Sequence, residues 1–347
     1  MIISLNLTYN CNMNCGYCCY KTDKYPGEMT LETALKTIEK FAKEENNIEF
    51  LGGEPLLKTE LIKNIIDSCK DRFKDKSFTY SLITNGLLLS DDFVKYAIRS
   101  DLSISLSLDG IKEAHDKFRK LKDGNDSWDI IIEKLKMLLE NSPYSPVLIT
   151  LNPETVKYLS ASYKFLIDNK VDTVNLSLNH QAEWKPEDFV LLEQELNIIA
   201  DYYINAHENN EVIVFNPFDS KIHAYITSNI SKGRCSIDSD HVTVAPDGSI
   251  FPCIAFIDKN MKYQIGNIND GINTNKLNDF KESCNAVINN LDCVKCEFAD
   301  RCYNWCSCAN YLGTKTLSQI PFSLCKYEKI LIPIADRVGN TLYESKN

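Results

Sequence analysis

The placement of the cysteines is the feature that most constrains this chain. Of 14 cysteines, four fall between residues 11 and 19 and nine between residues 235 and 325, which leaves Cys69 by itself. Disulfides need an oxidising compartment, whereas thiols in a reducing cytosol stay available as thiolate ligands. No run reaches the roughly 18 apolar residues of a membrane span, and the N-terminus lacks the pattern of a secretory signal. The sequence therefore predicts a cytoplasmic protein with two metal-binding regions.

Composition and charge narrow the class of protein further. The chain has 347 residues, of which 44% are hydrophobic and 25% charged, enough for one large α/β domain and a smaller second one. Its formal charge is −10, so no electrostatic attraction to nucleic acid or to anionic lipid is expected. We predict neither a nucleic acid nor a membrane as a partner.

β-rich runs alternate with amphipathic stretches from the first residues onward. The predicted strands cover residues 2–7, 48–51, 78–83, 102–106, 147–151 and 173–178. The predicted helices cover residues 31–43, 60–72, 91–99, 128–139 and 155–168, followed by a helix over 193–207 and a short strand over 212–215. Six such units predict a parallel sheet, curved or closed, with helices outside.

Chemistry-bearing residues follow these strands, at the ends where parallel sheets gather their active sites. After the first strand come Cys11, Cys15 and Cys18. The ends of the later strands carry Gly52, Gly53, Glu54 and Pro55; Thr84, Asn85 and Gly86; Ser107, Asp109 and Gly110; Asn152; and Asn179 and His180. We therefore expect the site at this edge of the sheet.

Cys11, Cys15 and Cys18 are spaced C-x3-C-x2-C in one loop. Three such thiolates can bind three irons of a [4Fe–4S] cube and leave the fourth iron without a protein ligand. A zinc site is the alternative, but zinc usually takes four protein ligands with paired C-x2-C spacing. Cys19 is a fourth sulfur, although its side chain should diverge from that of its neighbour.

This triad, with Tyr17 before its third cysteine, resembles the cluster motif of the radical S-adenosylmethionine (radical SAM) family. Gly52, Gly53, Glu54 and Pro55 resemble the family's second motif. In that motif the glycines let the backbone approach the methionine moiety of SAM, and the acid accepts from its amino group. The resemblance also implies that Ser107 and Asp109 line the SAM pocket and that Arg119 binds the SAM carboxylate. The alternative for Arg119 and His115 is a solvated helix face.

The C-terminal cysteines form a second pattern. Their order resembles that of the SPASM domain, an extension of radical SAM enzymes that holds two auxiliary clusters; the cysteines concerned are Cys235, Cys253, Cys293, Cys296, Cys302, Cys306 and Cys325. By that resemblance four of them, Cys293, Cys296, Cys302 and Cys325, hold the outer cluster. The inner cluster then has Cys235, Cys253 and Cys306. A zinc knuckle over residues 293–306 is the alternative.

The inner cluster is thus predicted to have three cysteine ligands and a fourth iron that is open or held by something replaceable. His241 is one candidate for that iron, since imidazole can replace thiolate on an iron–sulfur cluster, but it also suits a strand beside Val242 and Val244. Cys308 is the other candidate, and it could equally be a structural thiol. Cys69 suits the core, whereas Cys19 and Cys284 have no assigned role.

These patterns predict an α/β protein with a partial (β/α)6 radical SAM barrel and a small cysteine-rich SPASM domain. The predicted boundaries are a barrel over residues 1–205, a linking region over 206–234, the SPASM domain over 235–330 and a C-terminal tail over 331–347. The predicted cofactors are SAM and three [4Fe–4S] clusters.

The resemblance implies oxidative modification of a ribosomally made peptide or protein, such as formation of a thioether or a carbon–carbon crosslink. An anaerobic sulfatase maturase, which makes formylglycine, is the second hypothesis. Those enzymes have an aspartate, proposed as a base, at the position of Ile254, and an aliphatic side chain cannot take a proton. A non-catalytic electron-transfer protein is the third hypothesis.

The partners implied are a precursor peptide or protein and a reductant such as flavodoxin or ferredoxin. The first predicted strand begins almost at Met1, so we expect leader recognition, where it occurs, to use a separate protein or a barrel surface.

Overall fold

A computed structural model describes residues 1–18, 27–227, 240–257, 261–285 and 291–344. Cys19 and Cys235 therefore lie outside the described residues. None of the helices in these ranges has the length and apolar character needed to cross a bilayer.

One sheet runs through the part of the chain that the structure describes. Its 11 strands have the order β11-β10-β9-β8-β1-β2-β3-β4-β5-β6-β7. The strands are β1 (Ile2–Asn6), β2 (Glu45–Leu51), β3 (Ser77–Thr84), β4 (Leu102–Ser107), β5 (Val147–Leu151), β6 (Thr173–Leu178), β7 (Val214–Phe215), β8 (His241–Val244), β9 (Ser249–Phe251), β10 (Gly266–Asn267) and β11 (Gly271–Ile272). β1 to β7 pair in parallel, β8 joins β1 in parallel, and β9 to β11 continue in antiparallel.

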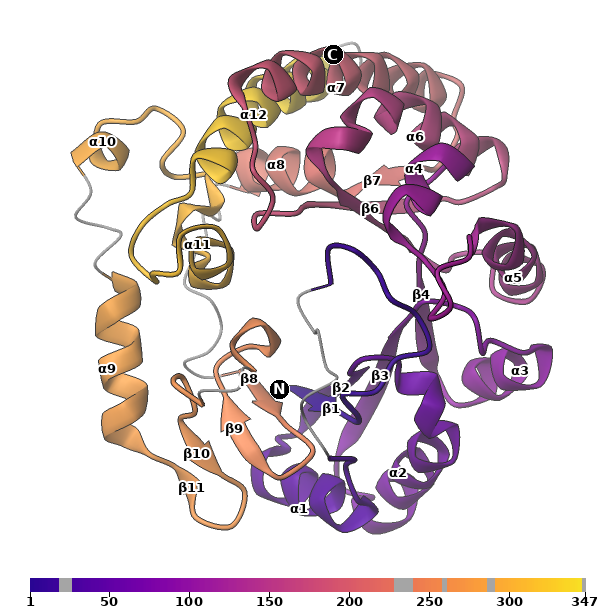
Figure 1. Cartoon of the computed structure of the whole chain (residues 1–347), viewed down its shortest axis with the longest axis vertical. Coiled ribbons are helices and arrows are strands. Elements are labelled where there is room, and N and C mark those ends of the chain that lie inside the picture. Colours follow the sequence, from indigo (N-terminus) through magenta and orange to yellow (C-terminus); the bar gives the residue numbers. More distant parts are fainter. Residues whose placement is uncertain (19–26, 228–239, 258–260, 286–290, 345–347) are drawn as a thin grey trace.

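Helices cover the outer side of the curved sheet (Figure 1). The α-helices are α1 (Leu31–Phe41), α2 (Thr59–Arg72), α3 (Asp91–Arg99), α4 (Lys112–Phe118), α5 (Trp128–Asn141), α6 (Leu159–Asp168), α7 (Pro186–Glu208), α8 (Asn216–Thr227), α9 (Thr274–Asn285), α10 (Leu291–Val294), α11 (Ser307–Thr314) and α12 (Phe322–Glu344). The 3-10 turns are η1 (Pro55–Lys58), η2 (Pro153–Tyr158), η4 (Ile254–Phe256) and η6 (Tyr303–Trp305). Local signals set several helix starts: the side chains of Thr30 and Ser90 accept from backbone N–H groups in the first turns of α1 and α3.

The predicted α/β class and the partial barrel are confirmed. All six predicted strands are present, and the helices predicted over 91–99 and 128–139 correspond to α3 and α5. The helix predicted over 155–168 begins instead as η2, and the one predicted from residue 193 begins seven residues earlier, at Pro186. α4, α8 and α12 were not among the predicted elements.

Two of the three predicted domain boundaries fall inside helices, and the third, between residues 234 and 235, lies outside the described residues. Residue 205 lies in α7, and residue 330 lies in α12, so the segment expected as a C-terminal tail is mostly helix. The sheet also crosses the proposed boundary, because β8 pairs with β1 from Ile2 opposite His241 onward. The C-terminal region is thus built onto the barrel sheet, and it adds a small apolar cluster of its own that includes Phe251, Phe256 and Phe280.

A buried ion pair joins α8 to α12. Nζ of Lys221 lies 2.6 Å from a carboxylate oxygen of Glu328, and both side chains are 1% exposed. The same ammonium donates to the carbonyl of Arg301 at 2.7 Å and lies 3.6 Å from the ring centre of Tyr303. Burial raises the pKa of Glu328, and the ammonium of Lys221 opposes that shift.

Removing one partner of this pair should leave the other charge buried and uncompensated. We expect Lys221→Met to lower the free energy of unfolding by about 3–5 kcal/mol, whereas the double variant with Glu328→Leu should lie closer to the parent. Urea unfolding followed by far-ultraviolet circular dichroism measures the free energy of unfolding of the single and the double variant.

The exposed pair of Lys164 and Asp168 on α6 is the matched control, and Lys164→Met should leave the free energy of unfolding nearly unchanged, because water screens this pair. Equal losses for the two single variants would contradict the assigned energetic role of burial.

Candidate active site

The loop after β1 carries the first three predicted metal ligands. It lies in the concave side of the sheet, between the barrel strands and the C-terminal region (Figure 1). Backbone hydrogen bonds dock it against the end of α4 and the residues just after it: Gly16 donates to the carbonyl of Phe118 and Asn14 to that of Lys120, both at 2.8 Å. The loop is therefore held by its backbone, independently of its cysteine side chains.

The thiols of Cys11, Cys15 and Cys18 are half-buried and interact electrostatically with one another. Burial raises the pKa of the Cys11 thiol, and it raises that of Cys15 to about 11, with the neighbouring thiols adding to both shifts. Ionising three such thiols together needs a nearby cation. A cluster of irons would supply it, so the residues fit the predicted group.

No three described His, Cys, Asp or Glu side chains are gathered as closely as the ligands of one metal ion. The choice between an iron–sulfur cluster and zinc at the triad therefore stays a prediction from the sequence.

The glycines of the second motif bring two loops into contact. A Cβ at Gly53 would meet the carbonyl oxygen of Asn10 at 2.3 Å, and one at Gly52 would meet that of Thr8 at 2.6 Å. With no side chains in the way, Gly53 donates to the Thr8 carbonyl at 2.8 Å. The structure thus gives the glycines a role in packing the cysteine loop, and their contact with SAM stays a prediction.

Glu54 ties the ends of β2 and β3 together. Its carboxylate is 1% exposed and accepts from the Thr84 hydroxyl at 2.7 Å and from the N–H groups of Asn85 and Leu56 at 2.9 and 3.0 Å. Burial raises its pKa, and these hydrogen bonds oppose the shift. Pro55 begins η1 and is buried beside it. The sequence did not reveal this positioning role, and the predicted contact of Glu54 with SAM is untested.

Asn85 connects the second motif to the cysteine loop. Its side-chain amide donates to Oδ1 of Asn12 at 2.8 Å and lies 3.6 Å from Sγ of Cys11. Its place at a strand end was the only signal in the sequence, and no role was predicted for it.

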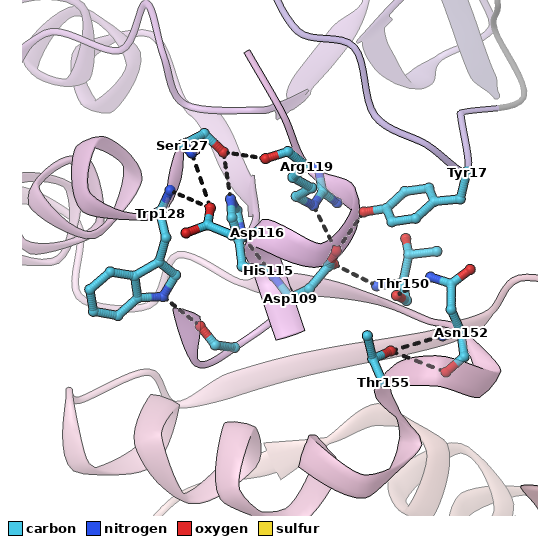
Figure 2. A network of polar contacts seen from close by, with 11 residues as sticks. Tyr17, Asp109, His115, Asp116, Arg119, Ser127, Trp128, Thr150, Asn152 and Thr155 are labelled. Carbon is cyan, nitrogen blue, oxygen red and sulfur yellow. Dashed lines mark hydrogen bonds and ion pairs between the residues drawn. The ribbon is translucent and has the colours of Figure 1, made fainter. Parts of the chain in front are cut away.

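Asp109 stands at the centre of a buried network beyond β4. Its carboxylate accepts from the Tyr17 hydroxyl at 2.6 Å, from Nε of Arg119 at 3.0 Å and from the backbone N–H of Thr150 at 2.9 Å. Figure 2 shows the carboxylate between Tyr17 and Arg119. The guanidinium of Arg119 also lies 5.4 Å from the Tyr17 ring centre. The structure thus brings together three predicted site residues, while Ser107 lies half-buried at the end of β4.

His115 and Ser127 support this network from behind (Figure 2). Nδ1 of His115 accepts from the backbone N–H of Asp109 at 3.3 Å, and Nε2 lies 3.0 Å from Oγ of Ser127. Ser127 in turn donates to the carbonyl of Arg119 at 2.7 Å. His115 is 0% exposed and Arg119 is 7% exposed, so the alternative of a solvated helix face is wrong for both.

The described cysteines of the predicted outer cluster lie near one another. Cys293 interacts electrostatically with Cys296 and Cys325, and Cys302 interacts with Cys325. Burial raises the pKa of the Cys302 thiol to about 12, with Glu328 adding to the shift and Lys221 opposing it. The buried ion pair of α8 and α12 therefore adjoins this group.

The predicted inner set is partly described. The thiols of Cys253, Cys306 and Cys308 interact electrostatically with one another. His241 is the first residue of β8, which confirms the strand interpretation, and Nε2 lies 2.8 Å from Oγ of Ser4. Cys69 is 1% exposed and packs in the barrel core, as predicted.

Comparisons with known proteins agree with this geometry. The family model of the Radical SAM superfamily matches residues 5–179. The radical SAM cyclopropyl synthase TigE of Paramaledivibacter caminithermalis is 26% identical, over 95% of this chain and 72% of that protein. A cysteine-type anaerobic sulfatase-maturating enzyme of Clostridium novyi is 25% identical, over 86% of this chain and 85% of that protein. The solved structure of native anSMEcpe with bound AdoMet and Cp18Cys peptide has a TM-score of 0.82 at 21% identity, covering 99% of both chains, and shares the fold.

The buried imidazole beside Asp109 should make stability depend on pH. Burial, aided by Arg119, lowers the pKa of His115 to about 2, whereas an imidazole in the unfolded chain titrates near 6.5. As the pH falls below that value, the unfolded state binds a proton that the folded state does not. The free energy of unfolding should then fall by up to about 1.4 kcal/mol per pH unit, and His115→Asn should remove this part of the slope between roughly pH 4 and 6.

His223→Asn, at an exposed position of α8, controls for the loss of a histidine as such. Urea unfolding at a series of pH values gives the slopes. Equal slopes for the parent and His115→Asn would show that His115 is not neutral in the folded protein.

Proposed function

Because the chain belongs to the radical SAM superfamily, we propose that it oxidatively modifies a side chain or backbone position of a ribosomally made peptide or protein. As a radical SAM enzyme it uses SAM and a [4Fe–4S] cluster. The modification we propose is formation of a thioether or a carbon–carbon crosslink, in the cytoplasm. Membership in the superfamily favours an enzyme over the non-catalytic electron-transfer alternative.

Cys11, Cys15 and Cys18 would hold the cluster that works with SAM. When bound and reduced, that cluster supplies the electron that cleaves SAM to methionine and a 5′-deoxyadenosyl radical. The protein's own part is to fix the loop, and the backbone bonds from Asn14 and Gly16 do so. Asn85 contacts Cys11 and also donates its backbone N–H to Glu54. A movement of the second motif would therefore shift the cysteine loop.

The pocket for SAM would lie along the same strand ends. Gly52, Gly53, Glu54 and Pro55 would face the methionine moiety, with Ser107 and Asp109 along the pocket wall. Asp109 accepts a hydrogen bond from Nε of Arg119. The terminal nitrogens of the guanidinium would then bind the carboxylate of SAM. Asp109 and Tyr17 would therefore orient Arg119.

Two auxiliary clusters in the C-terminal region would bring the total to three. Cys293, Cys296, Cys302 and Cys325 would hold the outer one, and their mutual proximity supports that assignment. Cys253 and Cys306 would bind the inner one together with Cys235, which lies outside the described residues. These clusters are the proposed acceptors of the electron that an oxidised product must lose. The proposed partners are the peptide, a reductant such as flavodoxin or ferredoxin, and a separate leader-binding protein where the substrate carries a leader.

Ile254 is the residue on which the proposed substrate class depends. Ile254 follows Cys253 where sulfatase maturases are expected to have an acidic base, and its aliphatic side chain cannot accept a proton. The TigE relative, named a cyclopropyl synthase, supports bond formation of another kind. Sulfatase maturation is the second candidate, supported by the 85% coverage of the Clostridium novyi enzyme and by the bound peptide of the solved structure.

Three clusters predict about twelve irons in the anaerobically reconstituted protein, four per cluster. Changing Cys11, Cys15 and Cys18 together to Ala should remove about four of them and abolish formation of 5′-deoxyadenosine, because only the auxiliary clusters are left. Iron analysis and chromatography of the SAM products measure the two effects. Cys69→Ala, in the barrel core, should change neither, and an unmutated protein with only about four irons would refute the three-cluster proposal.

The substrate class is tested with peptides encoded beside the gene. With SAM and a reductant, a crosslink should lower the mass of a short cysteine-rich or repeat-bearing peptide by two hydrogens, and fragmentation should locate the new bond. Conversion of a Cys or Ser to formylglycine in a peptide from a neighbouring sulfatase would instead support the second candidate. The triple cysteine variant is the control for both reactions.

A further inference from the structure

Asn85 lies in the turn that follows β3, between Thr84 and Gly86. Gly86 has a left-handed φ of 84°, and a Cβ there would meet Cδ1 of Leu106 at 2.5 Å, so a side chain does not fit at this position. The hydroxyl of Thr84 accepts from the backbone N–H of Gly86 at 3.0 Å. The residues on both sides therefore fix the turn, and Asn85 is only 8% exposed within it.

Two hydrogen bonds fix the direction of the Asn85 side chain. Its backbone N–H donates to Oε2 of Glu54 at 2.9 Å, and its Oδ1 accepts from the backbone N–H of Leu87 at 3.0 Å. The contact with Leu87 decides which end of the amide is the oxygen, because an N–H donates only to an acceptor. The Nδ2 end of the amide is therefore directed to the cysteine loop, where its partners are Asn12 and Cys11.

The Nδ2 group has two hydrogens and two partners on that loop. It donates to Oδ1 of Asn12 at 2.8 Å and to Sγ of Cys11 at 3.6 Å. The second distance is longer because sulfur is a larger atom than oxygen. The backbone N–H of Met13 donates to the same sulfur at 3.4 Å. The Cys11 sulfur thus receives one hydrogen bond from its own loop and one from the turn after β3.

These donors favour negative charge on the Cys11 sulfur. Burial raises the pKa of the Cys11 thiol, the N–H of Met13 and the amide of Asn85 oppose that shift, and the carboxylate of Glu54 adds to it. A donor that stabilises negative charge on a thiolate also stabilises an iron–sulfur cluster that has taken up an electron. Hydrogen bonds to the sulfurs are among the features that set the reduction potential of such a cluster.

We infer that Asn85 is a positioning residue whose side-chain amide, through its hydrogen bond to Cys11, raises the reduction potential of the cluster that the triad binds. The inference rests on the proposed function, because it requires that Cys11, Cys15 and Cys18 bind this cluster. It gives Asn85 a role in electron uptake, in addition to its link with the second motif. Without this donor, a stronger reductant would be needed to reduce the cluster.

The competing role for Asn85 is a purely structural one, in which its amide only anchors the cysteine loop through Asn12. The two roles use different hydrogens of the same amide, so two variants can separate them. Asn12→Ala removes the anchor and keeps the donor to the Cys11 sulfur. Asn85→Leu removes both the anchor and the donor, whereas Asn85→Asp keeps the acceptor for Leu87 and replaces the donor by an oxygen.

The test uses the full reconstituted chain and the electron paramagnetic resonance signal that is lost when Cys11, Cys15 and Cys18 are changed to Ala. A redox titration of this signal gives the potential of the cluster. In Asn85→Leu the ratio of reduced to oxidised cluster at a fixed potential should fall about tenfold, the effect of one hydrogen bond to a charged group, which is about 59 mV for one electron. Asn85→Asp should fall at least as far, and Asn12→Ala should keep the potential of the parent.

Pulsed measurements in deuterated water give a second readout. An exchangeable hydrogen close to the cluster should be lost in Asn85→Leu and kept in Asn12→Ala. A parent-like potential in a folded Asn85→Leu or Asn85→Asp protein, or an equal fall in Asn12→Ala, would overturn the inference alone. If changing the three cysteines of the triad removes no signal, the proposed ligand set of this cluster is wrong as well.

Discussion

The carboxylate of Asp109 is the contact on which the candidate active site depends. It holds Tyr17 of the cysteine loop, Arg119 at the end of α4 and the backbone of Thr150 on β5, so three separate segments converge on one group. Each contact is needed, because a buried guanidinium without a counter-charge is costly and a buried carboxylate needs donors. The backbones of Asp109 and Arg119 are also held in place, because His115 accepts from the N–H of Asp109 and Ser127 donates to the carbonyl of Arg119. The site is therefore preorganised by charge and hydrogen bonding before any cofactor binds.

Much of the barrel could be predicted from sequence because its strands are short β-rich runs bounded by polar turns. The first and last residues of α7 and α12 could not be predicted in this way. α12 contains Pro333, which opposes a helix interior, and it is held by packing against α7 and α8 from distant parts of the chain. Likewise, strand position pointed to Asp109, but the burial of Arg119 and His115 depends on how the segment after β4 folds back. Side-chain partners set by tertiary structure are not encoded in local periodicity.

The C-terminal region shows how a cysteine-rich segment can be stable with little core of its own. Its strands extend the barrel sheet through β8, so their backbone groups are satisfied by the larger domain. α12 then returns to pack on α7 and α8, and the ion pair of Lys221 and Glu328 fixes that return. Because Cys302 interacts electrostatically with both charges, the position of a predicted ligand and the docking of α12 are coupled. α12 thus also contributes to the surroundings of a predicted metal ligand.

The two predicted groups of C-terminal cysteines differ in their surroundings. The outer group adjoins a buried ion pair, which surrounds it with fixed charges of both signs. The inner group lies against aromatic side chains, because Cys253 and Cys308 pack on the cluster that contains Phe251, Phe256 and Phe280. Of the two charges, the Glu328 carboxylate acts more strongly on the Cys302 thiol than the Lys221 ammonium does, so the pair makes this thiol harder to ionise. The two groups of cysteines thus differ in their surroundings, which are charged for the outer group and aromatic for the inner one.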